Sequence, residues 1–138
     1  MTVLETQRLT FRPYEEADFD AMAALHCTPS VMAHMRGGAV DRHAARRAFD
    51  SYLYHWRDSD ISIWALRRKD DGAFIGECGF WVRADFPGRS MRYILAEPYW
   101  GRGYALEAAM AAVQWGFEIK RIPRITAVAQ QANPASVR

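Results

Sequence analysis

The sequence has few of the residues that build covalently linked or metal-bound scaffolds. It contains two cysteines, Cys27 and Cys78, in 138 residues, and they lie far apart. There is no Cys-x-x-Cys motif and no His/Cys group with zinc-ligand spacing. These absences argue against a disulfide framework and a structural zinc site. We therefore expect a reduced, cytoplasmic protein without a bound metal.

Long hydrophobic runs and a strong charge of one sign are also absent. No apolar stretch approaches the roughly 18 residues that a membrane span needs, so we expect no membrane partner. The formal net charge is +2 and the basic residues are scattered, which argues against a nucleic-acid partner. Half of the residues are hydrophobic (50%) and a quarter are charged (25%), as in an ordinary globular domain. The length predicts a single domain.

The hydrophobic pattern changes between strand and helix periods along the chain. Leu9 and Phe11 alternate with polar neighbours, which predicts a short strand that ends at Pro13. Asp41 is a suitable N-cap for a helix with an apolar stripe. The predicted elements are strand 8–13, helix 15–27, helix 42–57, strand 61–66, strand 73–82, strand 90–96, helix 103–118 and strand 125–129.

Turn signals connect the three middle strands of this series. Asp70, Asp71 and Gly72 form a hairpin signal, and Pro87 with Gly88 marks a second turn. The three strands therefore form an antiparallel meander, which predicts an α+β fold.

The turn before the Ala-rich helix is the segment most informative about function. A helix N-terminus exposes unpaired backbone N–H groups and the positive end of the helix dipole. Gly101 and Gly103 allow positive φ angles and a close approach of the backbone to an anion. Arg102 adds a positive charge, and no acidic residue lies between Pro98 and Leu106. These features predict a phosphate or pyrophosphate site.

Two common phosphate-binding motifs do not fit this turn. The G-x-x-x-x-G-K-[ST] loop is absent, and the third glycine of G-x-G-x-x-G is replaced by Leu106. The turn also follows an antiparallel meander, whereas a dinucleotide fingerprint opens an early βαβ unit. From these residues alone, a tight connection without a ligand remains the alternative.

Three segments resemble one known family. Residues 96–109, A-E-P-Y-W-G-R-G-Y-A-L-E-A-A, resemble the acetyl-CoA-binding motif of the GNAT superfamily of N-acetyltransferases, most closely its RimJ/RimL-like branch of ribosomal-protein-alanine acetyltransferases. Residues 4–13 resemble the opening strand of that branch, and N-P-A-S at 133–136 resembles the start of a later helix. The resemblance implies a mixed, mostly antiparallel sheet flanked by helices. The family normally continues through a full helix and two more strands, so the resemblance also implies that the C-terminal part of the domain is missing.

The resemblance further implies an activity and a set of cofactor-binding residues. The chain would transfer an acetyl group from acetyl-CoA to a primary amine, either a protein N-terminus or a small molecule, by direct attack and without a metal. A homodimer is compatible with the resemblance. The implied cofactor-binding residues are Ile94, Leu95 and Ala96 beside the pantetheine arm, Gly101, Arg102, Gly103, Tyr104 and Ala105 around the pyrophosphate, and Asn133 and Ser136 on the next helix.

The candidate catalytic groups are less well defined. Many relatives have a glutamate at the position of Ser90, and a backbone N–H near Leu95 would polarise the thioester carbonyl. Glu77, on an apolar strand, is the candidate base, with a pKa that burial would raise; alternatively, it points to solvent. His34 and Tyr93 are weaker candidates. The alternatives to an enzyme are a non-catalytic acyl-CoA-binding module and a truncated fragment.

Overall fold

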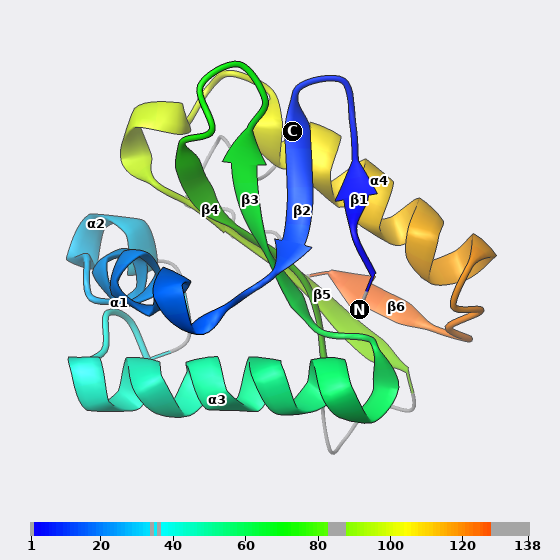
Figure 1. Cartoon of the computed structure of the whole chain (residues 1–138), viewed down its shortest axis with the longest axis horizontal. Helices are drawn as coiled ribbons and strands as arrows, with labels where there is room; N and C mark the ends of the chain where they lie inside the picture. Colours follow the sequence, from blue (N-terminus) through cyan, green and yellow to red (C-terminus); the bar gives the residue numbers. More distant parts are fainter. Residues whose placement is uncertain (1, 34, 36, 83–87, 128–138) are drawn as a thin grey trace.

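The computed structural model describes residues 2–33, 35, 37–82 and 88–127 (Figure 1). Within these residues the chain forms a six-stranded sheet in which the strands lie in sequence order. Neighbouring strands are antiparallel except for the last pair, which is parallel. The strands are β1 (Leu4–Glu5), β2 (Leu9–Pro13), β3 (Ile63–Arg68), β4 (Phe74–Val82), β5 (Arg89–Leu95) and β6 (Ile125–Ala127).

Helices cover both faces of this sheet (Figure 1). On one face lie α1 (Phe19–His26), α2 (Pro29–Met32) and α3 (Arg42–Ser59), and α4 (Tyr104–Glu118) lies on the other. Two short 3-10 turns, η1 (Glu16–Asp18) and η2 (Glu97–Tyr99), precede α1 and α4. The α4 face holds an aromatic core around Trp64, Phe80 and Trp115. Among the described residues, no helix combines the length and the apolar character needed to cross a bilayer.

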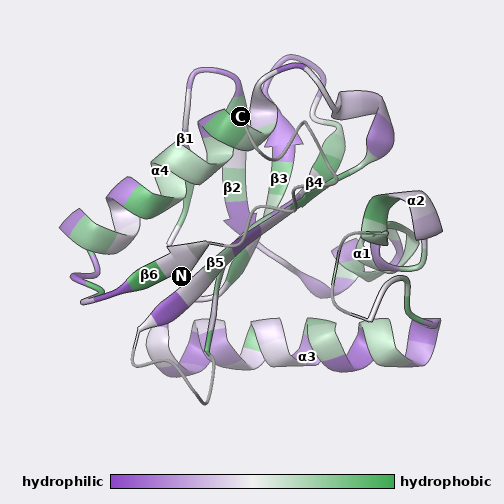
Figure 2. Ribbon diagram, turned by 180° about the vertical axis from the view of Figure 1, so that it is seen from behind, coloured by the Kyte–Doolittle hydropathy of each residue, from purple (hydrophilic) through white to green (hydrophobic). Residues whose placement is uncertain are grey.

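The N-cap and the apolar stripe of α3 both favour a helix over the same residues. The Asp41 carboxylate accepts a 2.8 Å hydrogen bond from the backbone N–H of Ala44, which confirms the predicted N-cap. The buried positions follow a helical spacing, and exposed polar residues lie between them, so hydrophobic and hydrophilic residues alternate along the helix in Figure 2. The helix ends at Asp60, which adopts a left-handed conformation with φ of 55°.

The structure confirms the α+β class and the mostly antiparallel sheet, with corrections to individual elements. The predicted helix 15–27 is divided between η1 and α1, and α2 follows as a separate turn that begins at Pro29. The predicted strand 61–66 instead runs from Ile63 to Arg68, and the Ser62 hydroxyl before it donates a hydrogen bond to the Tyr52 carbonyl of α3. Strand β1 was not predicted, since it is too short to show a period.

Candidate active site

The glycine-containing turn before α4 has the backbone conformation that the sequence predicted. Gly101 and Gly103 have φ angles of 74° and 81°, in the left-handed region that favours glycine. Gly103 is the N-cap of α4 and provides no side chain to cap the helix. None of the backbone N–H groups of residues 101–106 has a hydrogen-bond acceptor among the described residues. The turn therefore presents a row of unpaired donors at the positive end of a helix.

The space around this row differs between the two glycines. A Cβ atom added at Gly101 would have no neighbour within 4 Å, whereas one added at Gly103 would lie 3.4 Å from a guanidinium nitrogen of Arg8. Arg102 is exposed, while the Tyr104 side chain is buried in the core. Tyr104 can therefore reach a ligand through its N–H but not through its ring. As far as the described residues go, the side of Gly101 is therefore open to an anion.

The end of strand β5 has one edge that faces away from β4. The N–H of Ala96 donates a 2.8 Å hydrogen bond to the carbonyl of Ile75 in β4. Because backbone groups alternate along a strand, the N–H of Leu95 points to the opposite edge. The Leu95 carbonyl on that edge accepts a 2.8 Å hydrogen bond from the Trp100 indole. The described pairing of β5 with β6 covers only Arg89 to Met91.

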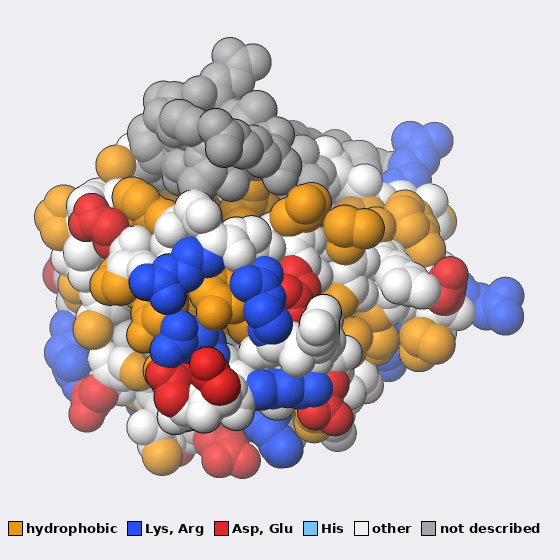
Figure 3. Space-filling model, turned by 90° about the horizontal axis from the view of Figure 1, so that it is seen from above, with side chains coloured by type: hydrophobic (Ala, Val, Ile, Leu, Met, Phe, Trp, Pro, Cys, Tyr) orange, Lys and Arg blue, Asp and Glu red, His pale blue; other side chains and the backbone are white. Residues whose placement is uncertain are grey.

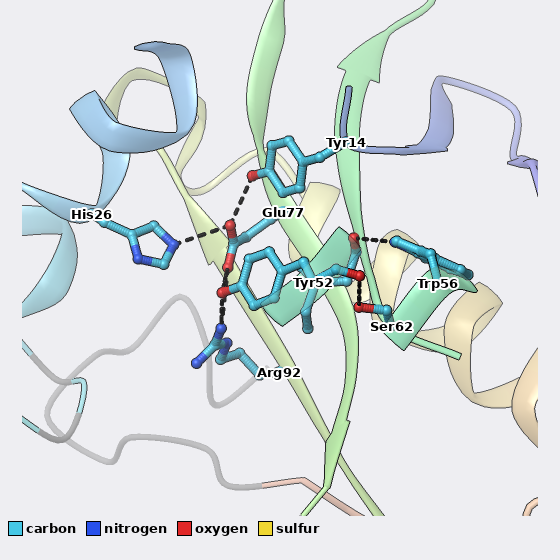
Figure 4. Close-up of polar contacts among 8 residues, drawn as sticks. Tyr14, His26, Tyr52, Trp56, Ser62, Glu77 and Arg92 are labelled. Carbon is cyan, nitrogen blue, oxygen red and sulfur yellow. Dashed lines mark hydrogen bonds and ion pairs between the residues drawn. The ribbon is translucent and has the colours of Figure 1, made fainter. Parts of the chain in front are cut away.

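Glu77 of β4 lies at the centre of a buried polar cluster (Figure 4). Its carboxylate is fully buried, and its Oε1 atom accepts hydrogen bonds from the Tyr14 hydroxyl at 2.7 Å and lies 3.0 Å from Nε2 of His26. The Oε2 atom accepts a hydrogen bond from the Tyr52 hydroxyl at 2.9 Å and lies 3.4 Å from an Arg92 guanidinium nitrogen. Arg92 also contacts the Tyr52 hydroxyl. One carboxylate thus joins α1, α3, β5 and the segment after β2.

Comparison with known proteins identifies the family. The acetyltransferase (GNAT) domain family matches residues 8–138. The chain belongs to the GNAT acetyltransferase family. A crystal structure of an acetyltransferase from Agrobacterium tumefaciens is 32% identical, with a TM-score of 0.84 over 99% of this chain and 79% of that one.

Curated relatives of this GNAT chain are also similar over nearly its whole length. The uncharacterized protein YkkB of Bacillus subtilis is 29% identical over 99% of this chain and 81% of its own length. The uncharacterized N-acetyltransferase p20 of Bacillus licheniformis is 28% identical over 100% of this chain and 79% of its own length. The family and these relatives support an acetyltransferase enzyme.

For this GNAT chain, the prediction that the pKa of Glu77 is raised is wrong. Burial raises the pKa of the carboxyl group, but the charge and hydrogen bond of His26, the charge of Arg92 and the hydrogen bond from Tyr14 together lower the pKa to about 2. The alternative expectation, that Glu77 points to solvent, is also wrong because the side chain is 0% exposed. The carboxylate is therefore ionised at neutral pH and is a weak base.

Ser90 lies on the same face of β5 as Arg92, two residues along the strand. It is only 3% exposed, and its hydroxyl has no hydrogen-bond partner among the described residues. A buried, unpaired hydroxyl is unusual in a folded protein and is explained when a bound group or a water supplies the partner. The position of Ser90 is thus compatible with a role at the site.

Three of the candidate residues lie outside the described residues. Asn133, Ser136 and His34 fall among residues that the structure does not describe. Cys78 is buried, and this burial raises the pKa of its thiol, so it is not a nucleophile. The described residues contain no group of His, Cys, Asp and Glu side chains that could hold a metal ion.

The partners of Glu77 were not predicted from the sequence. Tyr14, His26, Tyr52 and Arg92 are separated from it by 15 to 63 positions, and no spacing rule connects them. One signal for Arg92 was available in the sequence, because it is a charged residue between Ser90 and Ile94, both buried, on one face of β5.

Proposed function

We propose that this chain binds acetyl-CoA and transfers its acetyl group to a primary amine by direct attack. The main support is the row of backbone N–H groups from Gly101 to Leu106, which have no acceptor in the part of the chain that the structure describes. A pyrophosphate at this position gains hydrogen bonds from these amides and lies at the favourable end of the α4 dipole. Acetyl-CoA is the co-substrate of the family, and it contains both this pyrophosphate and the reactive acetyl thioester.

The cofactor contacts follow from the directions of backbone groups. Gly101 to Ala105 would bind the pyrophosphate through their N–H groups, with Arg102 adding a charge. The pantetheine arm would lie along the edge of β5 at Ile94, Leu95 and Ala96, where the Leu95 N–H is directed away from β4. Asn133 and Ser136 are proposed as further contacts from the sequence resemblance alone.

The reaction needs a neutral amine, a polarised carbonyl and a protonated leaving group. The amine nitrogen bonds to the carbonyl carbon, the carbon–sulfur bond breaks, and the amine proton is lost as the thiolate gains one. We assign polarisation of the carbonyl to the Leu95 N–H. Ser90 would contact the acceptor amine, directly or through water, because its buried hydroxyl has no other described partner.

Glu77 is better suited to positioning than to proton transfer. Its carboxylate is ionised, fully buried and already bonded to Tyr14, His26 and Tyr52. Its contact with Arg92 places a guanidinium, 23% exposed, on the same strand face as Ser90. Glu77 would thus act on the reaction by holding Arg92 in place relative to α1 and α3.

The acceptor is proposed as a protein N-terminal amine or a small-molecule amine. The support is the motif at residues 96–109, which resembles the RimJ/RimL-like branch. We would measure acetyl-CoA binding by calorimetry and then release of the CoA thiol with a panel of N-terminal peptides and small amines. The proposal predicts binding and turnover with at least one amine. Binding without turnover would instead indicate an acyl-CoA-binding module, and absence of binding would overturn the proposal.

A further inference from the structure

The turn between β1 and β2 contacts the cofactor turn although the two are far apart in the sequence. Arg8 donates a hydrogen bond from its side chain to the backbone carbonyl of Arg102 at 3.0 Å. The same guanidinium donates through Nε to Oε1 of Glu107 at 2.6 Å, and it lies over the Tyr104 ring at 4.3 Å from the centroid. Figure 3 shows this end of the molecule, where basic and acidic side chains gather over hydrophobic ones.

Glu107 is held in place from the same turn. Its Oε2 atom accepts hydrogen bonds from the Thr6 hydroxyl at 2.5 Å and from the Arg8 backbone N–H at 3.0 Å. Burial raises the pKa of Glu107, but the hydrogen bonds from Thr6 and Arg8 outweigh this effect and lower it. Glu107 is therefore an ionised residue in the first turn of α4, close to the proposed anion site.

The hydrogen bond from Arg8 to the Arg102 carbonyl fixes the direction of the Gly103 N–H group. A trans peptide group places its C=O and N–H on opposite sides, and none of the described peptide bonds is cis. When Arg8 holds the Arg102 carbonyl, the N–H of Gly103 must point away from Arg8. Arg8 also neutralises Glu107, whose negative charge would otherwise oppose an anion at the start of α4.

We propose that Arg8 is a positioning residue for acetyl-CoA, because it anchors the Arg102 carbonyl and so orients the Gly103 N–H toward the pyrophosphate. This inference rests on the proposed function. Arg8 itself does not need to touch the cofactor. A guanidinium is required because its fork reaches Glu107 and the Arg102 carbonyl together, whereas a single ammonium nitrogen satisfies one of them well.

The test compares Arg8→Met and Arg8→Lys with a matched control, Arg46→Met. Arg46 is 38% exposed, is paired with Glu16 and lies over the ring of Phe19 at 5.0 Å, but it is on α3. Arg8 is 42% exposed and is similarly paired and stacked. Both Arg8 variants should weaken acetyl-CoA binding about tenfold, the effect of losing one charge-assisted hydrogen bond. Arg46→Met should leave the affinity unchanged.

A second measurement distinguishes a specific loss of pyrophosphate binding from a general loss of folding or activity. S-acetylpantetheine carries the thioester but no pyrophosphate. The Arg8 variants should lose kcat/KM with acetyl-CoA, mainly through KM, and keep the wild-type value with S-acetylpantetheine. An Arg8→Lys variant with wild-type acetyl-CoA affinity would overturn the inference, and so would an equal loss with both substrates. A wild-type chain that binds no acetyl-CoA would overturn the proposed function as well, so the two failures are distinguishable.

Discussion

The hydroxyl of Tyr14 donates a 2.7 Å hydrogen bond to the carboxylate of Glu77, and the two residues are 63 positions apart in the chain. Both groups are buried, so water does not weaken the interaction. Burial raises the pKa of the Tyr14 hydroxyl, and the charge of Glu77 raises it further, so the phenol stays a donor. The same carboxylate contacts His26, Tyr52 and Arg92. It therefore links helices α1 and α3 to strands β4 and β5 of the sheet.

Removal of this carboxylate should destabilise the fold. Glu77→Ala leaves Arg92 and two phenols without their buried partner, and breaking a buried pair in this way costs about 3–5 kcal/mol. We expect that decrease in the free energy of unfolding, measured by urea denaturation. Glu97→Ala, at an exposed position of η2, is the control and should change stability by no more than about 0.5 kcal/mol. A Glu77→Ala loss below about 1 kcal/mol would contradict the central role of the carboxylate.

The same residue makes stability depend on acid pH. The pKa of Glu77 is about 2 in the folded state, against an ordinary value of 4.5. The unfolded state therefore binds the proton more readily, and the stabilising effect is complete above pH 4.5 and is lost as the pH falls toward 2. Urea midpoints for the wild type and Glu77→Gln should differ by a constant amount above that window and converge within it. A difference that stays constant through the window would show that the pKa is not lowered.

The Ser90→Ala substitution should lower the activity without lowering the stability. The Ser90 hydroxyl is buried without a described partner, so its removal should leave the free energy of unfolding unchanged or raise it by up to about 1 kcal/mol. If Ser90 contacts the acceptor, kcat should fall about fivefold or more, the effect of losing one hydrogen bond of about 1 kcal/mol. Thiol release at saturating acetyl-CoA gives the rate. An unchanged kcat would remove Ser90 from the site.

A carboxylate in the cofactor turn should abolish acetyl-CoA binding. Gly101→Asp places a negative charge where no protein atom lies within 4 Å of the new Cβ, at a φ of 74°. Gly38→Asp is the matched control, because Gly38 has a φ of 66° and is equally unobstructed, but lies before α3. Both variants bear similar backbone strain, of about 1–2 kcal/mol. Calorimetry should show binding only for the control; equal binding by both would place the pyrophosphate elsewhere.

Much of the fold was predictable because local patterns and tertiary packing agree. In α3, the Asp41 cap and the stripe that includes Phe49 and Trp56 indicate the same helix, and the structure contains it. The Asp70-to-Gly72 turn likewise joins β3 to β4 as predicted, with Gly72 at a φ of 71°. Strand β1 and helix α2 escaped prediction because elements this short have no period to recognise.

The candidate site was predictable only where its residues are neighbours in the sequence. The cofactor turn is one continuous segment, so its glycines and the following helix were visible together in the sequence. The Glu77 cluster is assembled from residues on separate elements, and its electrostatics depend on His26 and Arg92, which the sequence does not connect to Glu77. For that reason the direction of the Glu77 pKa shift was predicted wrongly, while the conformation of Gly101 and Gly103 was predicted correctly.

The proposed function depends on binding of the acetyl-CoA pyrophosphate by backbone amides at the start of α4 that have no acceptor among the described residues. The most direct measurement is a titration of the ¹⁵N-labelled chain with acetyl-CoA, followed by amide NMR, with ADP and S-acetylpantetheine titrated in parallel. We predict that the Gly101 and Gly103 amide resonances shift with acetyl-CoA and with ADP, and hardly move with S-acetylpantetheine. If acetyl-CoA binds and leaves both glycine resonances unmoved, the pyrophosphate does not bind at this turn.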